Sequence, residues 1–141
     1  APGISPITEV AVRAADLVLV TSIPDFLSTY GLNAFVETIW RRSSRQASHI
    51  APKSAPYVLV TRFQAQVRQH QRTLARLQAE ARAEDAGFHL LETRIPQAAA
   101  LADALVPADG APPTFSAKYG AHVPNVLIPL VAEVKEILHG P

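Results

Sequence analysis

The stretch from Ala14 to Trp40 constrains the fold of this chain more than any other. It begins with a short, uninterrupted apolar run, Leu17–Val20, that contains two β-branched valines. Such a run is typical of a strand buried on both faces of a parallel sheet. Pro24 ends the run, and from Phe26 to Trp40 the apolar residues recur at the three- and four-residue spacing of one helix face. A strand, a turn and a helix in this order predict the opening of a βαβ unit.

The same alternation of strand and helix continues along the chain. Strands are expected at Tyr57–Thr61 and Phe88–Thr93, and helices at Ile4–Ala15, Phe63–Asp85, Gln97–Leu105 and Val123–Leu138. Strands separated by helices of this length predict parallel pairing with right-handed crossovers. We therefore expect an α/β fold, a three-layer sandwich with a mostly parallel sheet of about three strands, in which residues 1–141 form one unit.

The composition excludes several classes of protein. The apolar runs are far shorter than the ~20 residues of a membrane span, and no signal peptide is visible. The chain has no Cys, which excludes disulfides and fits the cytoplasm. It also has no Met and starts at Ala1, so we expect a piece of a longer protein, or a chain whose initiator has been removed.

Known catalytic and metal-binding motifs are missing from the sequence. None of the six glycines stands in a phosphate-binding G-x-x-x-x-G-K-[ST] or G-x-G-x-x-G motif. The five histidines show no metal-ligand spacing, and no serine stands in a nucleophile motif. Asp25 follows the first strand, where it suits a helix N-cap better than a catalytic site. We expect no catalytic residue and no metal site in this chain.

Charge is distributed unevenly along the sequence. The net charge is only +1, yet no Asp or Glu occurs between Thr38 and Ala79. Within that window three arginines four residues apart form a stripe on one face of the expected helix: Arg68, Arg72 and Arg76. Like charges at this spacing repel by about 0.2–0.5 kcal/mol per pair, a penalty that an anionic partner would remove. The stripe is thus a candidate DNA-binding surface or an ordinary solvated helix face.

A second group of arginines follows the preceding helix. It consists of Arg41, Arg42 and Arg45. Cations suit a helix C-terminus because they interact favourably with the helix dipole. These residues are therefore candidates for DNA contact or for simple helix capping.

The residues around the first strand resemble ParA-type partition ATPases, of the deviant P-loop superfamily that includes MinD. The resemblance lies in the strand Asp16–Val20, the turn Pro24-Asp25-Phe26 and the helix start at Gly31-Leu32, and it continues over nearly the whole chain. The family's Gly-rich phosphate loop is absent, and Ala1-Pro2-Gly3 resembles the turn that follows the Walker B acid. The resemblance implies a partial P-loop NTPase fold, the C-terminal part of a larger ATPase domain.

The resemblance also implies where a nucleotide base would lie in the intact parent. The matching segments follow the second and third expected strands and contain Thr61, Arg62, Ile95, Pro96 and Gln97. The parent would use ATP and Mg²⁺, dimerise, bind nonspecific DNA and respond to a partner protein bound at a centromere-like site during bacterial plasmid or chromosome segregation. This chain alone would bind no cofactor and would be inactive as an ATPase.

Two other functions fit the same sequence. One is a nucleotide-free interaction or dimerisation module derived from this fold. The other is a fragment of a MinD-like site-selection ATPase, but a membrane-binding basic helix is not apparent, because Lys135 stands between Glu133 and Glu136. Leu17–Val20 and Val58–Val60 have the character of central strands and contain no edge-protecting Lys or Pro. A sheet cut beside such strands would expose a hydrophobic edge, so we expect a homo-oligomer rather than a monomer.

Overall fold

The computed structural model describes residues 5–41, 52–99, 101, 110, 114 and 123–140. Strands and helices alternate along these residues. In chain order they are α1 (Pro6–Ala14), β1 (Leu19–Ser22), α2 (Phe26–Val36), the π-helical turn η1 (Glu37–Arg41), β2 (Tyr57–Phe63), α3 (Arg68–Arg82), β3 (His89–Pro96) and α6 (Pro124–His139).

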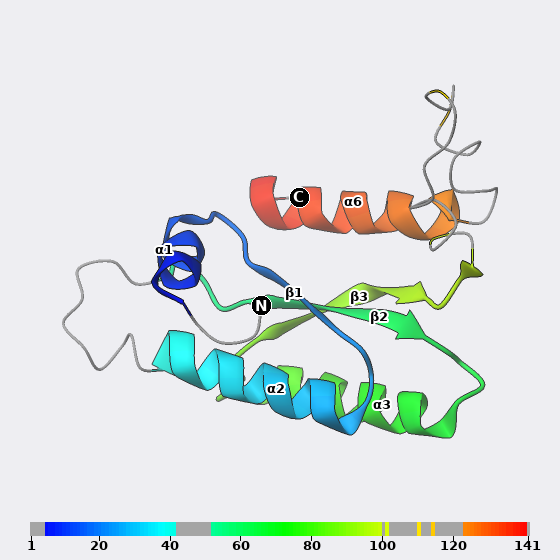
Figure 1. Cartoon of the computed structure of the whole chain (residues 1–141), viewed down its shortest axis with the longest axis horizontal. Coiled ribbons are helices and arrows are strands. Elements are labelled where there is room, and N and C mark those ends of the chain that lie inside the picture. The colour runs from blue at the N-terminus through cyan, green and yellow to red at the C-terminus, as the bar shows by residue number, and fades with distance from the viewer. Residues whose placement is uncertain are drawn as a thin grey trace.

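The three strands form one parallel sheet in the order β1-β2-β3. Figure 1 shows α2 and α3 on one face of the sheet and α6 on the opposite face. These observations confirm the expected α/β class with a parallel sheet. The central-strand character of Val58–Val60 is confirmed, because β2 pairs with both neighbours, whereas β1, which contains Leu19 and Val20, is an edge strand of this sheet.

Element boundaries differ from the expected ones at all three strands. β1 begins at Leu19 rather than Leu17, and β3 extends to Pro96. β2 continues to Phe63, which pairs with Pro96, so α3 starts only at Arg68. Phe63 has the spacing of a helical residue, but its side chain packs against the core from the strand. Most of the helix expected at Gln97–Leu105 lies outside the described residues.

The main core lies between the sheet and the helices α2 and α3. Val58, Val60 and Leu77 are completely buried there, and they pack with Leu32, Val36, Leu74 and Phe88. The alternating residues of β2 explain this arrangement, since Val58 and Val60 point to the same face of the sheet. The expected apolar helix face is confirmed at three positions, because Leu32 and Val36 of α2 and Ile39 of η1 are buried.

Asp25 fixes the start of α2 directly after the first strand. Its carboxylate accepts a hydrogen bond from the backbone N–H of Ser28 at 2.7 Å, and the Thr29 hydroxyl donates to the Asp25 carbonyl at 2.7 Å. This is the N-cap arrangement that satisfies an otherwise unpaired helix N–H. The N-cap interpretation of Asp25 is confirmed.

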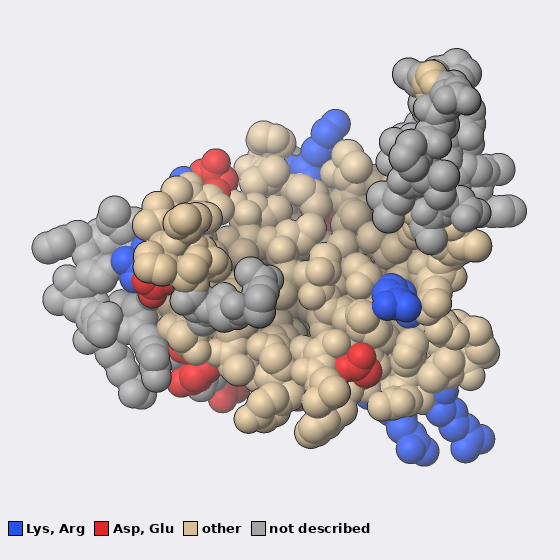
Figure 2. All heavy atoms as spheres, viewed as in Figure 1, with Lys and Arg blue, Asp and Glu red and all other residues tan. Residues whose placement is uncertain are grey.

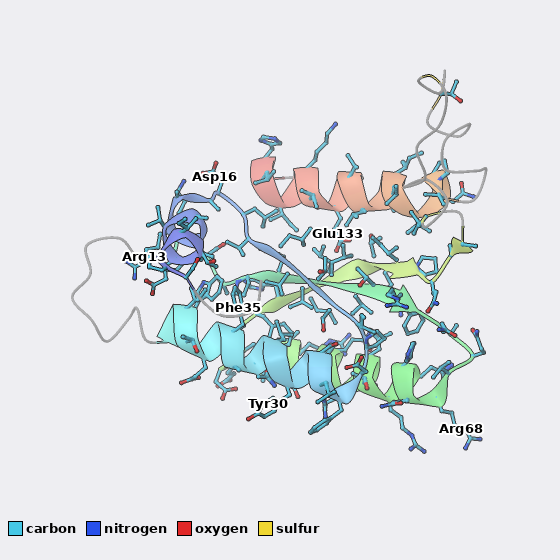
Figure 3. All side chains as sticks on the ribbon, viewed as in Figure 1. Arg13, Asp16, Tyr30, Phe35, Arg68 and Glu133 are labelled. Carbon is cyan, nitrogen blue, oxygen red and sulfur yellow. The ribbon has the colours of Figure 1, made fainter. Side chains whose placement is uncertain are left out.

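A single carboxylate from α6 contacts the backbone of β3. Glu133 Oε1 accepts from the N–H of Glu92 at 2.6 Å, and Oε2 accepts from the N–H of Thr93 at 3.0 Å. The two N–H groups lie where β3 departs from regular pairing with β2, between Leu90 and Arg94. Figure 3 shows Glu133 pointing from α6 toward the sheet. The carboxylate therefore satisfies donors at an irregularity in the ladder.

We expect replacement of Glu133 by Ala to lower the free energy of unfolding by about 1.5 kcal/mol, because two charge-assisted hydrogen bonds are lost. Glu136→Ala is the matched control, since Glu136 is exposed on the same helix. Urea denaturation measures both variants. Equal effects of the two substitutions would show that the Glu133 contacts do not hold α6 on the sheet.

Candidate nucleic-acid interface

The residues implied in base contact lie at the carboxyl ends of two neighbouring strands. Phe63 pairs with Pro96, and the Gln97 N–H donates to the Phe63 carbonyl at 3.1 Å. The Gln64 side chain also donates to the Gln97 side chain at 2.7 Å. Thr61 and Arg62 therefore lie at the same end of the sheet, formed by the carboxyl ends of β2 and β3, as Ile95, Pro96 and Gln97.

These residues do not line a common cavity. Thr61 and Arg62 line a cavity of about 640 Å³ with residues of β1 and α2. Pro96 lines another, of about 590 Å³, with Phe63, Arg94 and residues of α3. Ile95 lies half-buried in β3. The described residues thus lie at neighbouring strand ends, as base recognition would require, but they do not enclose a base between those ends.

Arg62 has an unusual backbone conformation. Its φ angle is 53°, and it is the only non-glycine residue with a positive φ in the described part of the chain. A left-handed conformation at such a residue costs of order 1–3 kcal/mol. The residue lies within a shift in the pairing register of β2 and β3, so the strain accompanies the irregular end of β2. No sequence signal marks it.

Three side chains that the sequence did not single out gather at the end of β2. The Arg94 guanidinium lies 5.4 Å from the centre of the Phe63 ring, and the His70 ring lies 6.3 Å from the same ring. His70 Nδ1 accepts a hydrogen bond from the Gln64 N–H at 3.1 Å, which ties the first turn of α3 to the strand end. Sequence reasoning missed this group because it placed Phe63 in the helix.

The arginine stripe, Arg68, Arg72 and Arg76, lies exposed on α3. Figure 3 shows Arg68 pointing away from the body of the molecule, and Figure 2 shows cationic side chains projecting from the same corner. Arg76 forms an exposed ion pair with Glu80 at 3.6 Å. Within the described residues, neither Arg68 nor Arg72 forms an ion pair.

The start of α3 is electrostatically suited to an anion. The first turn contains no acid, and the N-cap residue Val67 makes no side-chain hydrogen bond to the helix. Arg68 occupies the first helical position, where a cation meets the positive end of the helix dipole. A negative ligand near this turn could accept hydrogen bonds from the uncapped N–H groups. It would also reduce the repulsion between Arg68 and the positive end of the helix dipole.

Only one arginine of the second group lies within the described part of the chain. Arg41 is the last residue of the π-helical turn η1. Arg42 and Arg45 lie outside the described residues.

Comparison with known proteins finds no match for this chain among family models, curated proteins or solved structures. In the part of the chain that the structure describes, no helix is long and apolar enough to cross a membrane. The same residues contain no group of three or more His, Asp or Glu side chains that could hold a metal ion.

Proposed function

We propose that the chain supplies the DNA-binding surface of a ParA-like partition ATPase. The observation that carries this proposal is the arginine stripe on α3, where Arg68 and Arg72 are exposed and have no acidic partner among the described residues. Arg68 and Arg76 are separated by eight helical residues, about 12 Å along the helix axis. This length allows several phosphates of one duplex to be contacted together.

The parallel sheet with helices on both faces supports the proposal, because a partial P-loop NTPase fold requires this arrangement. In the parent, ATP and Mg²⁺ would be held mainly by a phosphate loop outside these 141 residues. By the same resemblance, the base would lie near Thr61, Arg62, Ile95, Pro96 and Gln97. Dimerisation and release of DNA, stimulated by a centromere-binding partner, belong to the same proposal, as does a cytoplasmic location.

Duplex binding by this chain tests the proposed function. We expect similar affinities for two unrelated labelled duplexes of about 24 base pairs, measured by fluorescence anisotropy. If three phosphates are neutralised, log Kobs should fall with log salt with a slope of about −3. Absence of binding at about 50 mM salt, or binding to one sequence alone, would contradict nonspecific recognition through the stripe.

A further inference from the structure

A cavity lies at the outer edge of β3, on the side where this strand has no partner among the described strands. Its volume is about 590 Å³, within the range of about 300–1,000 Å³ that is typical of small-molecule sites. Figure 1 shows α3 and α6 on opposite faces of the sheet, both beginning near the end of β3. Residues of both helices line the cavity, so it is a cleft at the sheet edge between the two helical layers.

Most of the lining of this cavity is apolar. Leu74 is buried in the main core and Phe63 packs against that core, so the fold fixes part of the lining. The apolar lining residues are Phe63, Ala65, Leu74, Ala75, Pro96 and Val126, and the polar ones are Gln71, Gln78 and Arg94. An apolar cavity with a small number of polar groups has the usual composition of a small-molecule site.

Two of the polar side chains keep donors for a ligand. Within the described residues Arg94 forms no ion pair, and its guanidinium lies 5.4 Å from the centre of the Phe63 ring. That contact orients the guanidinium but gives its N–H groups no acceptor. The Gln78 amide makes no hydrogen bond within the same described residues, whereas Gln71 donates to the Ala65 carbonyl. Arg94 and Gln78 are therefore the available donors of the cavity.

We propose that this cavity binds a small carboxylic acid, as its monoanion, with an apolar body. The carboxylate accepts hydrogen bonds from Arg94, whose planar fork of N–H groups matches a carboxylate, and from the Gln78 amide. The apolar body packs against Leu74 and Val126, which removes its surface from water. One cation in the lining sets the charge of the ligand, because a second negative charge would have no cationic partner there.

The site goes beyond the proposed function and lies apart from the residues that carry it. No arginine of the stripe lines the cavity, and of the residues placed near the base by resemblance only Pro96 does. A DNA phosphate at Arg94 would leave the apolar lining exposed to water. A nucleotide would bring several negative charges to one guanidinium. The lining therefore favours a compact monoanion over either of these ligands.

Titration of isotope-labelled protein with 4-phenylbutyrate, octanoate and the neutral 4-phenylbutyramide tests the site by NMR. We expect a millimolar Kd for the carboxylates, as suits ligands of about a dozen non-hydrogen atoms, and binding of the amide weaker by about tenfold or more. Arg94→Gln should weaken carboxylate binding by about tenfold or more and leave the amide unchanged. Arg82→Gln, at an exposed arginine of α3 outside the cavity, is the matched control and should change neither.

The two carboxylates distinguish the possible sources of the ligand. Binding of either one that depends on Arg94 supports the site. Tighter binding of 4-phenylbutyrate would identify the apolar body as aromatic, and tighter binding of octanoate would identify it as a fatty chain.

Ala75→Phe tests the place of binding independently of charge. Ala75 lines the cavity from an exposed position on α3, so a larger side chain fills the space without entering the core. We expect this variant to lose saturable binding of 4-phenylbutyrate. Ala79→Phe places the same side chain at an exposed position one turn further along α3, outside the cavity lining, and should keep the wild-type affinity. Far-UV circular dichroism and thermal melting check that both variants are folded.

Several results would overturn the site. They are equal affinities for the carboxylate and the amide, equal effects of Ala75→Phe and Ala79→Phe, and the absence of shift changes at Gln78, Arg94 and Val126 with both carboxylates at about 20 mM. Duplex affinity is measured on the same variants. Loss of duplex binding in Arg94→Gln, with no binding of carboxylate to the wild type, would assign Arg94 to the DNA surface instead. Carboxylate binding by a chain that binds no duplex would reject the proposed function and retain the cavity site.

Discussion

Replacement of Arg68, Arg72 and Arg76 together by Glu is expected to weaken duplex DNA binding by about 100-fold or more at about 100 mM salt. Each substitution removes a cation and places a negative charge against phosphate. The residual binding should also lose its salt dependence, because fewer counterions are released. Fluorescence anisotropy over a salt series measures both quantities.

Folding should survive this triple substitution. Arg68→Glu places an acid in the first turn of α3, where the helix dipole favours it by about 0.3–1 kcal/mol. Arg76→Glu removes the exposed Arg76–Glu80 pair, which contributes about 0.3–0.5 kcal/mol, and leaves two like charges that repel by about 0.2–0.5 kcal/mol. These two costs offset the gain at Arg68. The thermal midpoint should therefore stay close to that of the wild type while DNA binding is lost.

Two controls sharpen this experiment. Replacement of the same three arginines by Lys keeps the charge and should retain affinity to within a few-fold, because phosphate contacts need a cation more than a fork geometry. Arg82→Glu changes one exposed arginine at the opposite end of the same helix. An equal loss of affinity with Arg82→Glu would show that overall charge, and not the stripe, controls binding.

Leu77→Ala is expected to destabilise the fold by about 3 kcal/mol, within the range of about 2–5 kcal/mol for buried leucines. Leu77 is 0% exposed, and it packs in the core that joins α3 to Val58 and Val60 of β2. Its removal leaves a cavity between the helix and the central strand. Guanidinium denaturation at equilibrium measures the change.

Leu27→Ala is the matched comparison for Leu77→Ala. The residue type and the substitution are the same, but Leu27 is 79% exposed, so the expected loss is below about 0.5 kcal/mol. Similar losses at the two positions would contradict the placement of the core between the sheet and α3.

The order of strands and helices could be predicted because the period of the apolar residues changes along the chain. Leu17–Val20 is a continuous apolar run, whereas Leu32, Val36 and Ile39 follow helical spacing, and the structure buries the latter three. The start of α2 was also predictable, since Asp25 is a residue that favours N-caps. Such signals are local, and each depends on only a few neighbouring residues.

The features that were missed depend on contacts between distant segments. Phe63 fits a helical pattern by spacing, and only its pairing with Pro96 shows that it belongs to β2. Glu133 contacts β3 across 41 residues of sequence, and nothing in the surrounding residues identifies its partner. The Arg68, Arg72 and Arg76 stripe was predictable because it lies within one helix.

The central claim is that the arginine stripe of α3 is the DNA surface, and titration of duplex DNA into isotope-labelled protein tests it most directly. We expect the largest NMR shift changes at the backbone amides and guanidinium groups of Arg68, Arg72 and Arg76, with small changes along α6 on the opposite face of the sheet. The changes should disappear at high salt, where phosphate contacts are screened. Shift changes concentrated on α6, or none in α3 at saturating DNA, would contradict the claim.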